Sequence, residues 1–395
     1  MKEILIALAS FTTGWLVSKT LDNIWEKIKK CVRKQCVKWR LRKRCKQKEN
    51  NYVPNISIIA EGLPIFNIDE HIQISISNHC FMLKTPVELC KRYPSIFKNH
   101  SDSDIWLKNC GVHEIEHFFE IQDLVPILEE CKREVTTDFM NRSGGCFFNN
   151  YLYGLISADG FGRSEDSNET PILTLEFFKT DYYSHKVMWQ LTQKLRKMGK
   201  LPTERLSVEQ LNNLYHCFRT SLGISIIAIL PSTNEIVLTR RSKTSSYGEG
   251  KEWIYVSVTE TISETDFDDS NNIRKLSVMK WIKRGLNEEL GLKDISSHYD
   301  DTTIQLYDMF FENYFYQDGL TASIMLSEKM DIEQLRTLPA KDKKLEVKEI
   351  FTIPNKPSDI EQFINNNHSE MREQTIFALQ SYALRLKVYH DEIAK

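Results

Sequence analysis

The sequence predicts an α+β protein that carries a membrane helix at its N-terminus. Its 395 residues suffice for two or three domains, and its 41% hydrophobic and 27% charged residues exclude a wholly disordered or fibrous chain. Apolar and polar residues alternate in some segments, as in strands, and recur at helical spacing in others. These observations predict four parts: a transmembrane helix at 1–20, a basic juxtamembrane helix at 21–50, an α+β middle domain at 51–210 and a further domain at 211–395.

Residues 1–20 are expected to cross a membrane. The uncharged run Ile4–Ser18 would span about 22 Å as a helix, against a hydrocarbon core of about 30 Å, and Lys2 and Lys19 can reach toward the headgroups to cover the difference. A signal peptide is the alternative, but Glu3 offsets Lys2 and the basic residues follow the apolar run. Because positive charge stays cytosolic, we expect a single-pass protein of the inner membrane with a short N-terminus outside and a cytosolic body.

The segment 21–50 is expected to form a basic amphipathic helix. Residues 1–50 hold 14 Lys and Arg against 4 Asp and Glu, which leaves 38 basic and 50 acidic residues for the rest of the chain. The apolar residues recur at spacings of three or four, at Leu21, Trp25, Ile28, Val32, Cys36 and Trp39. Such a helix can lie on anionic lipid of the inner membrane. A buried helix and a nucleic-acid-binding arm are the alternatives. A nucleic-acid-binding arm is disfavoured because this interpretation leaves the apolar run that precedes the segment unexplained.

The use of cysteine excludes two classes of structural site. The nine cysteines contain no CxxC pair, their number is odd, and none follows Cys217. This pattern excludes a zinc ribbon and a secreted disulfide framework, and it favours a reducing compartment for the body.

The middle segment combines strand and helix patterns. Alternating or continuous apolar residues predict strands at 56–59, 72–76 and 173–178. The segment 187–198 has helical periodicity and is followed by Gly199, a residue that often ends a helix. A polar loop is expected at 160–170.

One motif in this segment is typical of zinc proteases. His113 to His117 reads HEIEH, which on a helix would place two imidazoles on one face beside a glutamate. Catalytic zinc usually has three protein ligands, and no third ligand follows at a familiar spacing. We therefore favour a surface turn of helix and leave the motif out of the expected site.

The segment 284–292 carries the most specific motif of the chain, RGLNEELGL. It resembles the second half of the Nudix box, in which Arg-Glu-apolar-x-Glu-Glu-x-Gly-apolar follows a Gly and a Glu upstream. The resemblance implies that Glu288 and Glu289 present carboxylates to Mg²⁺, which would neutralise a diphosphate and activate water. It also implies that Arg284 orients a carboxylate and that Gly291 ends the helix. Catalytic roles would then fall to Glu288, Glu289 and Arg284, and metal binding to the two glutamates.

The sequence departs from the box at three positions. Ser270 stands where the family has its leading Gly, Leu276 where it has its first Glu, and Gly285 where it has the Glu after the arginine. An insertion at 261–272 has the acidic residues Glu264, Asp266, Asp268 and Asp269, which can compensate by entering the site. A solvated helix face is the alternative for Glu288 and Glu289. The loss at Gly285 favours binding over hydrolysis.

The surrounding pattern extends the resemblance over about 215–390. Strands are expected at 224–229, 236–239, 253–258, 304–311, 320–326 and 344–351, followed by a helix at 370–388. The resemblance implies a Nudix-like α/β/α sandwich for 211–395.

The whole arrangement resembles the transmembrane–Nudix effectors of CBASS, the bacterial anti-phage systems that signal with cyclic oligonucleotides. The resemblance implies that a cyclic nucleotide binds the Nudix-like domain, drives assembly of a homo-oligomer and leads the membrane segments to disrupt the inner membrane. Arg240, Arg241 and Lys243 are the candidates for nucleotide binding. The alternative is a membrane-anchored, Mg²⁺-dependent Nudix hydrolase of a nucleoside diphosphate derivative, so the sequence leaves open whether the protein is an enzyme.

Overall fold

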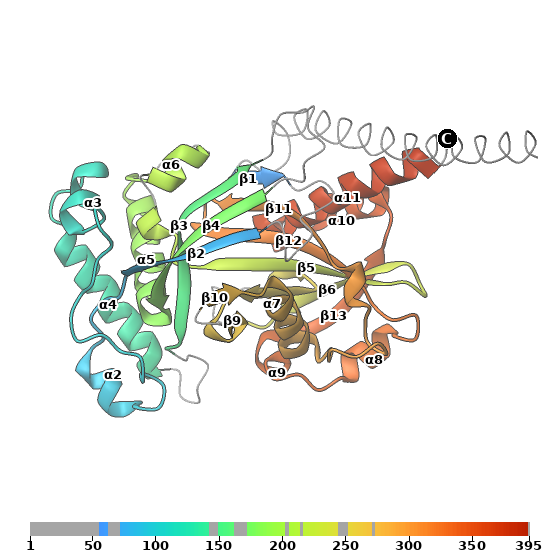
Figure 1. The fold of residues 1–395 in the computed structure, drawn as a ribbon, viewed down its shortest axis with the longest axis horizontal. Coiled ribbons are helices and arrows are strands. Elements are labelled where there is room, and N and C mark those ends of the chain that lie inside the picture. The colour runs from blue at the N-terminus through green and yellow to red at the C-terminus, as the bar shows by residue number, and fades with distance from the viewer. Residues whose placement is uncertain are drawn as a thin grey trace, which may run out of the picture. The chain divides into compact units, whose positions relative to one another are not determined.

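The fold is mixed α/β, and most of it belongs to one compact unit at residues 52–383 (Figure 1). The computed structural model describes residues 55–61, 72–141, 149–161, 172–201, 205–213, 216–243, 252–270 and 273–393. A second unit comprises residues 1–51 and 384–395, of which the described part is the end of helix α11.

A large mixed sheet forms the centre of the compact unit. Its strands follow the order β1 (Ile56–Glu61), β11 (Gln305–Glu312), β12 (Gln317–Met325), β5 (Leu222–Leu230), β6 (Glu235–Arg241) and β13 (Val347–Pro354), with β7 (Ile254–Val256) paired to β6 and β8 (Val258–Thr261) paired to β5. β12 and β5 are parallel, and the other pairs in this sheet are antiparallel. The first strand of the segment 51–210 therefore belongs to the same sheet as the strands that follow residue 211.

The sheet is covered on both faces, which explains the continuous apolar run of β5. All nine residues of β5 are buried, as expected for a central strand between two layers. On one face Ile224 and Ile226 share a hydrophobic core with Trp281 of helix α7 (Val278–Gly285). On the other face Phe310 of β11 packs against Phe377 of helix α11 (Glu373–Ile393), with ring centroids 5.0 Å apart.

A buried ion pair fixes the beginning of the parallel strands. Arg219, just before β5, donates from Nε and Nη2 to the two carboxylate oxygens of Asp318 on β12, at 2.9 and 2.6 Å. Both side chains are fully buried. Removing either partner would leave an uncompensated charge in the core.

The helix that carries the box motif has clear ends. Ser277 caps α7 by accepting a hydrogen bond from the Lys280 backbone N–H. The helix continues as a wider π-helical turn at Leu286–Leu290 and stops at Gly291, whose φ is 80°. A Cβ at Gly291 would lie 2.6 Å from the Pro339 carbonyl oxygen, so glycine is required there for both reasons.

A three-stranded sheet with helices on its face makes up the rest of the core. Its order is β2 (Ile72–Cys80), β4 (Ile172–Asp181) and β3 (Tyr151–Phe161), and the helices of this part are α2 (Val87–Arg92), α3 (Val112–Phe118), α4 (Leu124–Asn141), α5 (Tyr182–Lys197) and α6 (Val208–Asn213). Asp181 caps α5 by accepting from the Ser184 N–H. Buried residues of this sheet and of the large sheet belong to one hydrophobic core.

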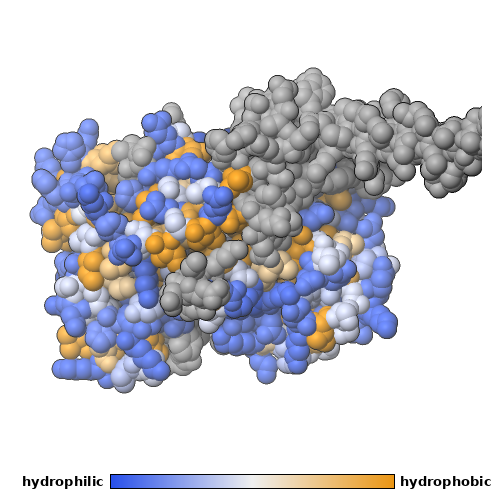
Figure 2. Space-filling model, viewed as in Figure 1, coloured by the Kyte–Doolittle hydropathy of each residue, from blue (hydrophilic) through white to orange (hydrophobic). Residues whose placement is uncertain are grey.

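The remaining elements lie around the edge strand β13 and the box helix (Figure 1). They are the β9 (Phe267–Ser270) and β10 (Ile273–Leu276) hairpin, α8 (Ile332–Thr337), α9 (Lys343–Glu346) and α10 (Pro357–Asn367). Figure 2 shows that hydrophilic residues cover most of one face, with hydrophobic residues in smaller groups between them.

The main correction to the predicted fold class and location concerns the expected membrane helix. Across the described ranges, no helix combines the length and the hydrophobicity needed to cross a membrane, so a single-pass inner-membrane protein is not supported. The segments 1–20 and 21–50, on which the expectation rested, lie outside the described residues.

The strand and helix predictions are otherwise confirmed in most places. β1, β2, β4, α5 and α11 contain or overlap the segments expected for them, and Gly199 has the left-handed φ of 68° expected after a helix. The expected strand at 253–258 is divided at Ser257, whose Oγ accepts from the Ala228 N–H. The expected strand at 344–351 begins instead with the short helix α9, and most of the expected loop, 162–170, lies outside the described residues.

Candidate ligand-binding site

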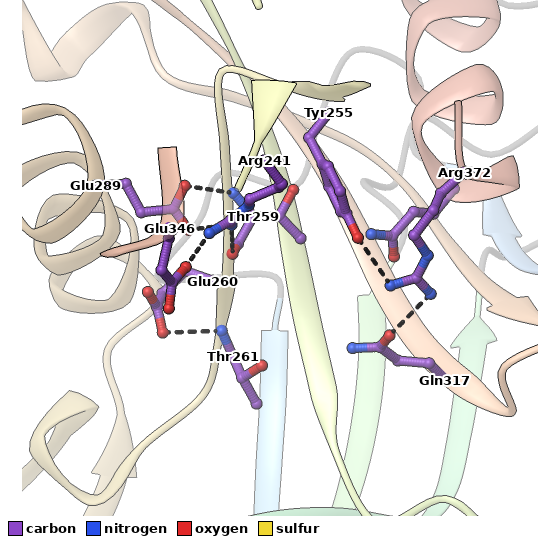
Figure 3. A pocket seen from close by; sticks show the side chains of 10 residues that line it. Arg241, Tyr255, Thr259, Glu260, Thr261, Glu289, Gln317, Glu346 and Arg372 are labelled. Atoms are coloured by element: carbon purple, nitrogen blue, oxygen red, sulfur yellow. Dashed lines mark hydrogen bonds and ion pairs between the residues drawn. The ribbon is translucent and has the colours of Figure 1, made fainter. Parts of the chain in front are cut away.

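A small polar pocket lies where the end of the box helix meets the strands β6 to β8 and the beginning of α11 (Figure 3). Its volume is about 100 Å³, and it is lined by Arg241, Tyr255, Thr259, Glu260, Thr261, Glu289, Gln317, Glu346, Arg372 and Gln374. Figure 3 shows two groups of side chains, with three glutamates around Arg241 on one side and Gln317 with Arg372 on the other. The volume accommodates a group about the size of a phosphate.

Glu289, the second glutamate of the motif, points into this pocket. Its side chain is 2% exposed, and its Oε1 accepts from Arg241 Nη2 at 2.8 Å. Burial and the nearby Glu260 raise the pKa of Glu289 to about 7, even though Arg241 favours the ionised form. A carboxyl group that titrates near neutral pH is thus held in contact with an arginine.

Arg241 donates hydrogen bonds to three protein acceptors. Besides Glu289, its guanidinium donates to a Glu346 carboxylate oxygen and to the Thr259 carbonyl oxygen at 3.2 Å. It also lies 5.2 Å from the ring centroid of Tyr255. Burial opposes the charge of Arg241, but the neighbouring Glu289 outweighs it and raises the arginine pKa.

Arg284 and Glu288 form a second network beside the pocket. Arg284 donates from Nε and Nη2 to the two oxygens of Asp266, each at 2.8 Å, and from Nη1 to Glu260 at 2.9 Å and to Glu288 at 3.0 Å. Asp266 is 1% exposed and belongs to the insertion at 261–272. Asp266 is thus the carboxylate that the box arginine orients; it does not line the pocket, and the expected compensation for the missing box carboxylates stays a prediction.

Glu260 connects the two networks. It lies on β8, pairs with Arg284, and raises the pKa of Glu289 by its charge. Burial raises the pKa of Glu260 itself, although Arg284 acts in the opposite direction. Glu288 also accepts a hydrogen bond from Lys341 Nζ at 3.1 Å. Its side chain is more exposed than that of Glu289.

Gly285 is the position at which the helix approaches β8 most closely. A Cβ added there would lie 3.0 Å from Glu260 Cβ and 3.1 Å from Val258 Cγ1. These contacts are tighter than ordinary van der Waals separations, so a side chain here requires Glu260 and Val258 to shift by a few tenths of an ångström. The glutamate that the Nudix box has at this position would meet the same close contacts.

The second arginine of the pocket, Arg372, comes from the residue just before α11. Its Nη2 donates to Glu312 at 2.6 Å and to Gln317 Oε1 at 3.3 Å, and it lies 3.9 Å from the ring centroid of Phe315. The Glu312 charge raises the pKa of Arg372 against the effect of burial. Its Nε is buried and has no hydrogen-bond partner among the described residues.

The structure brings together only part of the set predicted from sequence. Glu289 and Arg241 meet in the pocket, while Arg284 and Glu288 lie next to it. Arg240 points elsewhere and pairs with Glu370 at 2.7 Å. Lys243 is exposed and does not line the pocket.

The residues that sequence reasoning missed come from distant segments. They are Tyr255, Gln317, Glu346, Arg372 and Gln374, and also Glu260, which belongs to the strand before the insertion. None of these residues stands in a motif. They lie together only because β7, β12 and α11 pack around the box helix in the folded chain. The rule that alternate strand residues face opposite sides separates Arg240 from Arg241 but does not say which of them faces the pocket.

The two box glutamates do not offer free oxygens to a cation in this arrangement. Glu289 is engaged by Arg241 and by the Thr259 N–H at 3.4 Å, and Glu288 by Arg284 and Lys341. Within the described residues, no three or more His, Cys, Asp or Glu side chains are grouped to hold a metal ion. The donor set as it stands does not fit Mg²⁺, and the expected Mg²⁺ site stays a prediction.

The HEIEH motif is confirmed as a surface turn of helix α3. Its Glu114 accepts from the Gly111 N–H at 3.0 Å, and Glu116 accepts from the Leu124 N–H at 2.7 Å. His113 is 95% exposed on its side chain. Both glutamates therefore cap neighbouring backbone groups.

No protein-family model matches the chain, and no curated protein matches it as a relative. The resemblance to Nudix proteins and to CBASS effectors accordingly rests on the motif and on the residues described above, and it stays a prediction.

Proposed function

We propose that the region 216–383 is a Nudix-like nucleotide-binding module that holds its ligand in the pocket without cleaving it. The ligand class to which the resemblance points is a cyclic oligonucleotide. The module would then act as a sensor, in which occupancy of the pocket is the signal.

The observation that carries this proposal is the packing at Gly285. The carboxylate that the Nudix box places after its arginine is missing there, and a Cβ would lie 3.0 Å from Glu260 Cβ, so a side chain at this position requires its neighbours to shift by a few tenths of an ångström. Glu289 is turned into the pocket and held by Arg241 at 2.8 Å. Both features favour recognition over hydrolysis.

The lining of the pocket also supports binding of a nucleotide. It combines two guanidinium groups with amide and hydroxyl groups, which suit phosphoryl oxygens and the polar edges of bases. Convergent polar groups beside titratable residues of shifted pKa are features that ligand sites share.

Calorimetry on the full chain tests the proposal. Cyclic di- and trinucleotides and linear nucleoside diphosphates are titrated with and without Mg²⁺, and the ligand is analysed chromatographically afterwards. We expect saturable binding of a cyclic nucleotide that is recovered intact. Absence of binding across the panel would remove the proposal.

A second candidate is the Mg²⁺-dependent hydrolase of a nucleoside diphosphate derivative, and the pKa of Glu289 favours it. A carboxyl group with a pKa of about 7 is suited to accept a proton near neutral pH. This candidate requires cleavage that depends on Glu289, so turnover that persists in Glu289→Gln would exclude it.

The wider role that the resemblance implies is a ligand-triggered effector in antiviral defence that assembles as a homo-oligomer. A ligand favours assembly only if it binds the assembled state more tightly than the monomer. Light scattering of the full chain with and without the bound nucleotide tests this part, and an unchanged mass would contradict it.

A further inference from the structure

The two arginines of the pocket differ in the acceptors that their donors meet. Arg241 donates to two carboxylates and a carbonyl oxygen. Arg372 has one carboxylate partner, Glu312, and weaker contacts to Gln317 Oε1 at 3.3 Å and Tyr255 Oη at 3.5 Å. Since a guanidinium has five N–H donors, Arg372 keeps capacity for an additional acceptor, and its Nε is buried without a partner among the described residues.

A buried glutamine close to Arg372 also has an N–H donor that lacks an acceptor among the described residues. Gln374 is 4% exposed and lines the pocket. Its Nε2 has no hydrogen-bond partner in the part of the chain that the structure describes. Buried donors are nearly always satisfied, so a missing acceptor at this end of the pocket is a specific indication of a ligand oxygen or of water.

The charges along the pocket decide which end suits an anion. Arg241 is surrounded by Glu289 and Glu346, with Glu260 close by, so an anion there would meet carboxylates. At the other end the carboxylates near Arg372 are Glu312 and Glu373, and neither of them lines the pocket. An anionic group is therefore repelled from the Arg241 end and is drawn to the Arg372 end.

From this asymmetry we infer that the pocket contains a phosphate subsite formed by Arg372 and Gln374, with the Gln317 amide beside them. The inference rests on the proposed function and assigns the phosphate of the ligand to a residue far from the box motif. The Arg241 end then faces the donor groups of the ligand, such as amino or hydroxyl groups. Free phosphate and the phosphate of a nucleotide share this chemistry.

The experiment measures the binding of inorganic phosphate and of cyclic dinucleotides to the full chain by calorimetry. Arg372→Lys keeps the charge opposite Glu312 but removes Nε and the planar fork, so the variant avoids an unpaired buried carboxylate. Gln374→Met removes the amide donor at similar volume. Gln193→Met on α5 is the matched control, because Gln193 Nε2 is also unpartnered among the described residues but does not line the pocket.

We expect phosphate to bind the wild-type chain and to compete with the cyclic dinucleotide. Arg372→Lys and Gln374→Met should each weaken phosphate binding by about tenfold, since each removes a hydrogen bond to a charged group. The control should bind as the wild type does.

The outcomes separate this inference from the proposed function. Nucleotide binding that is unchanged in both variants would overturn the subsite and leave the nucleotide sensor standing. Phosphate binding that depends on Arg372, without any affinity for nucleotides, would support the subsite and remove the sensor. Failure of the wild-type chain to bind phosphate at millimolar concentration would overturn the subsite as well.

Discussion

Arg241 and Glu289, 48 residues apart in the sequence, form a buried ion pair of 2.8 Å inside the polar pocket. One comes from the end of β6 and the other from the box helix, so the pair ties the sheet to the helix. Because Glu289 has a pKa of about 7, this connection depends on pH near neutrality. In this pair Arg241 engages the carboxylate of Glu289, to which the sequence motif assigns a catalytic role.

The first prediction concerns pH and Glu289. Its pKa is raised from 4.5 to about 7 in the folded protein, so between these values the folded state keeps a proton that the unfolded chain has released. Its contribution to the free energy of unfolding therefore falls as the pH rises through this window, by at most about 3 kcal/mol. In Glu289→Gln this pH dependence should be absent.

Denaturant unfolding of the wild type and the variant from pH 4 to pH 8 measures the difference. The control is Glu333→Gln, an exposed glutamate whose removal should leave the pH profile of the wild type unchanged. If the free energy of unfolding of the wild type increased relative to that of the variant as the pH rises, the pKa of Glu289 would be lowered, contrary to the structure.

The second prediction concerns the close approach at Gly285. Gly285→Ala places a Cβ about 3 Å from Glu260 and Val258, and we expect a loss of about 1 to 2 kcal/mol despite the better helix propensity of alanine. Asn287→Ala, at an exposed position of the following turn, should change stability by less than about 0.5 kcal/mol. Equal or greater stability of Gly285→Ala in urea unfolding would mean that space for a side chain exists.

The resemblance and the periodicity predicted more of the helix than of the site. The resemblance predicted a helix that carries Glu288 and Glu289 and ends at Gly291, and the structure has this helix with its end at Gly291. The insertion was expected to bring acidic residues into the site; its Asp266 instead pairs with Arg284 beside the pocket. Arg372 was not predictable, because no local signal connects it to a helix about 80 residues earlier. Its place depends on the packing of α11 against the sheet.

The division of the predicted strand at 253–258 has a comparable origin. Ser257 interrupts the strand so that β7 pairs with β6 and β8 pairs with β5. Its hydroxyl lies between the Ala228 N–H and the Val237 carbonyl oxygen and satisfies both. The apolar pattern indicates a strand throughout and does not encode this change of partner, which carries Glu260 toward Arg284.

The third prediction concerns Arg284 as a structural centre. Its guanidinium holds Asp266, Glu260 and Glu288, and Asp266 is almost fully buried. Arg284→Gln leaves Asp266 and Glu260 without their ion-pair partner, and we expect a loss of about 3 to 5 kcal/mol in the free energy of unfolding. Arg240→Gln, which breaks partly exposed ion pairs, should cost no more than about 1 kcal/mol.

Urea unfolding of both variants at pH 7 provides the comparison. If Arg284→Gln were as stable as Arg240→Gln, the network around the box arginine would not be a stabilising element. The motif would then have to be explained by ligand contacts alone.

The most direct test of the central claim follows the fate of a nucleotide in the presence of the full chain. A cyclic dinucleotide is titrated calorimetrically with and without Mg²⁺, and the same samples are analysed by chromatography over several hours, with Glu289→Gln in parallel. The proposed function predicts saturable binding, no Mg²⁺ requirement and intact ligand in every sample. Cleavage by the wild type that is lost in Glu289→Gln would contradict it and make the protein a hydrolase.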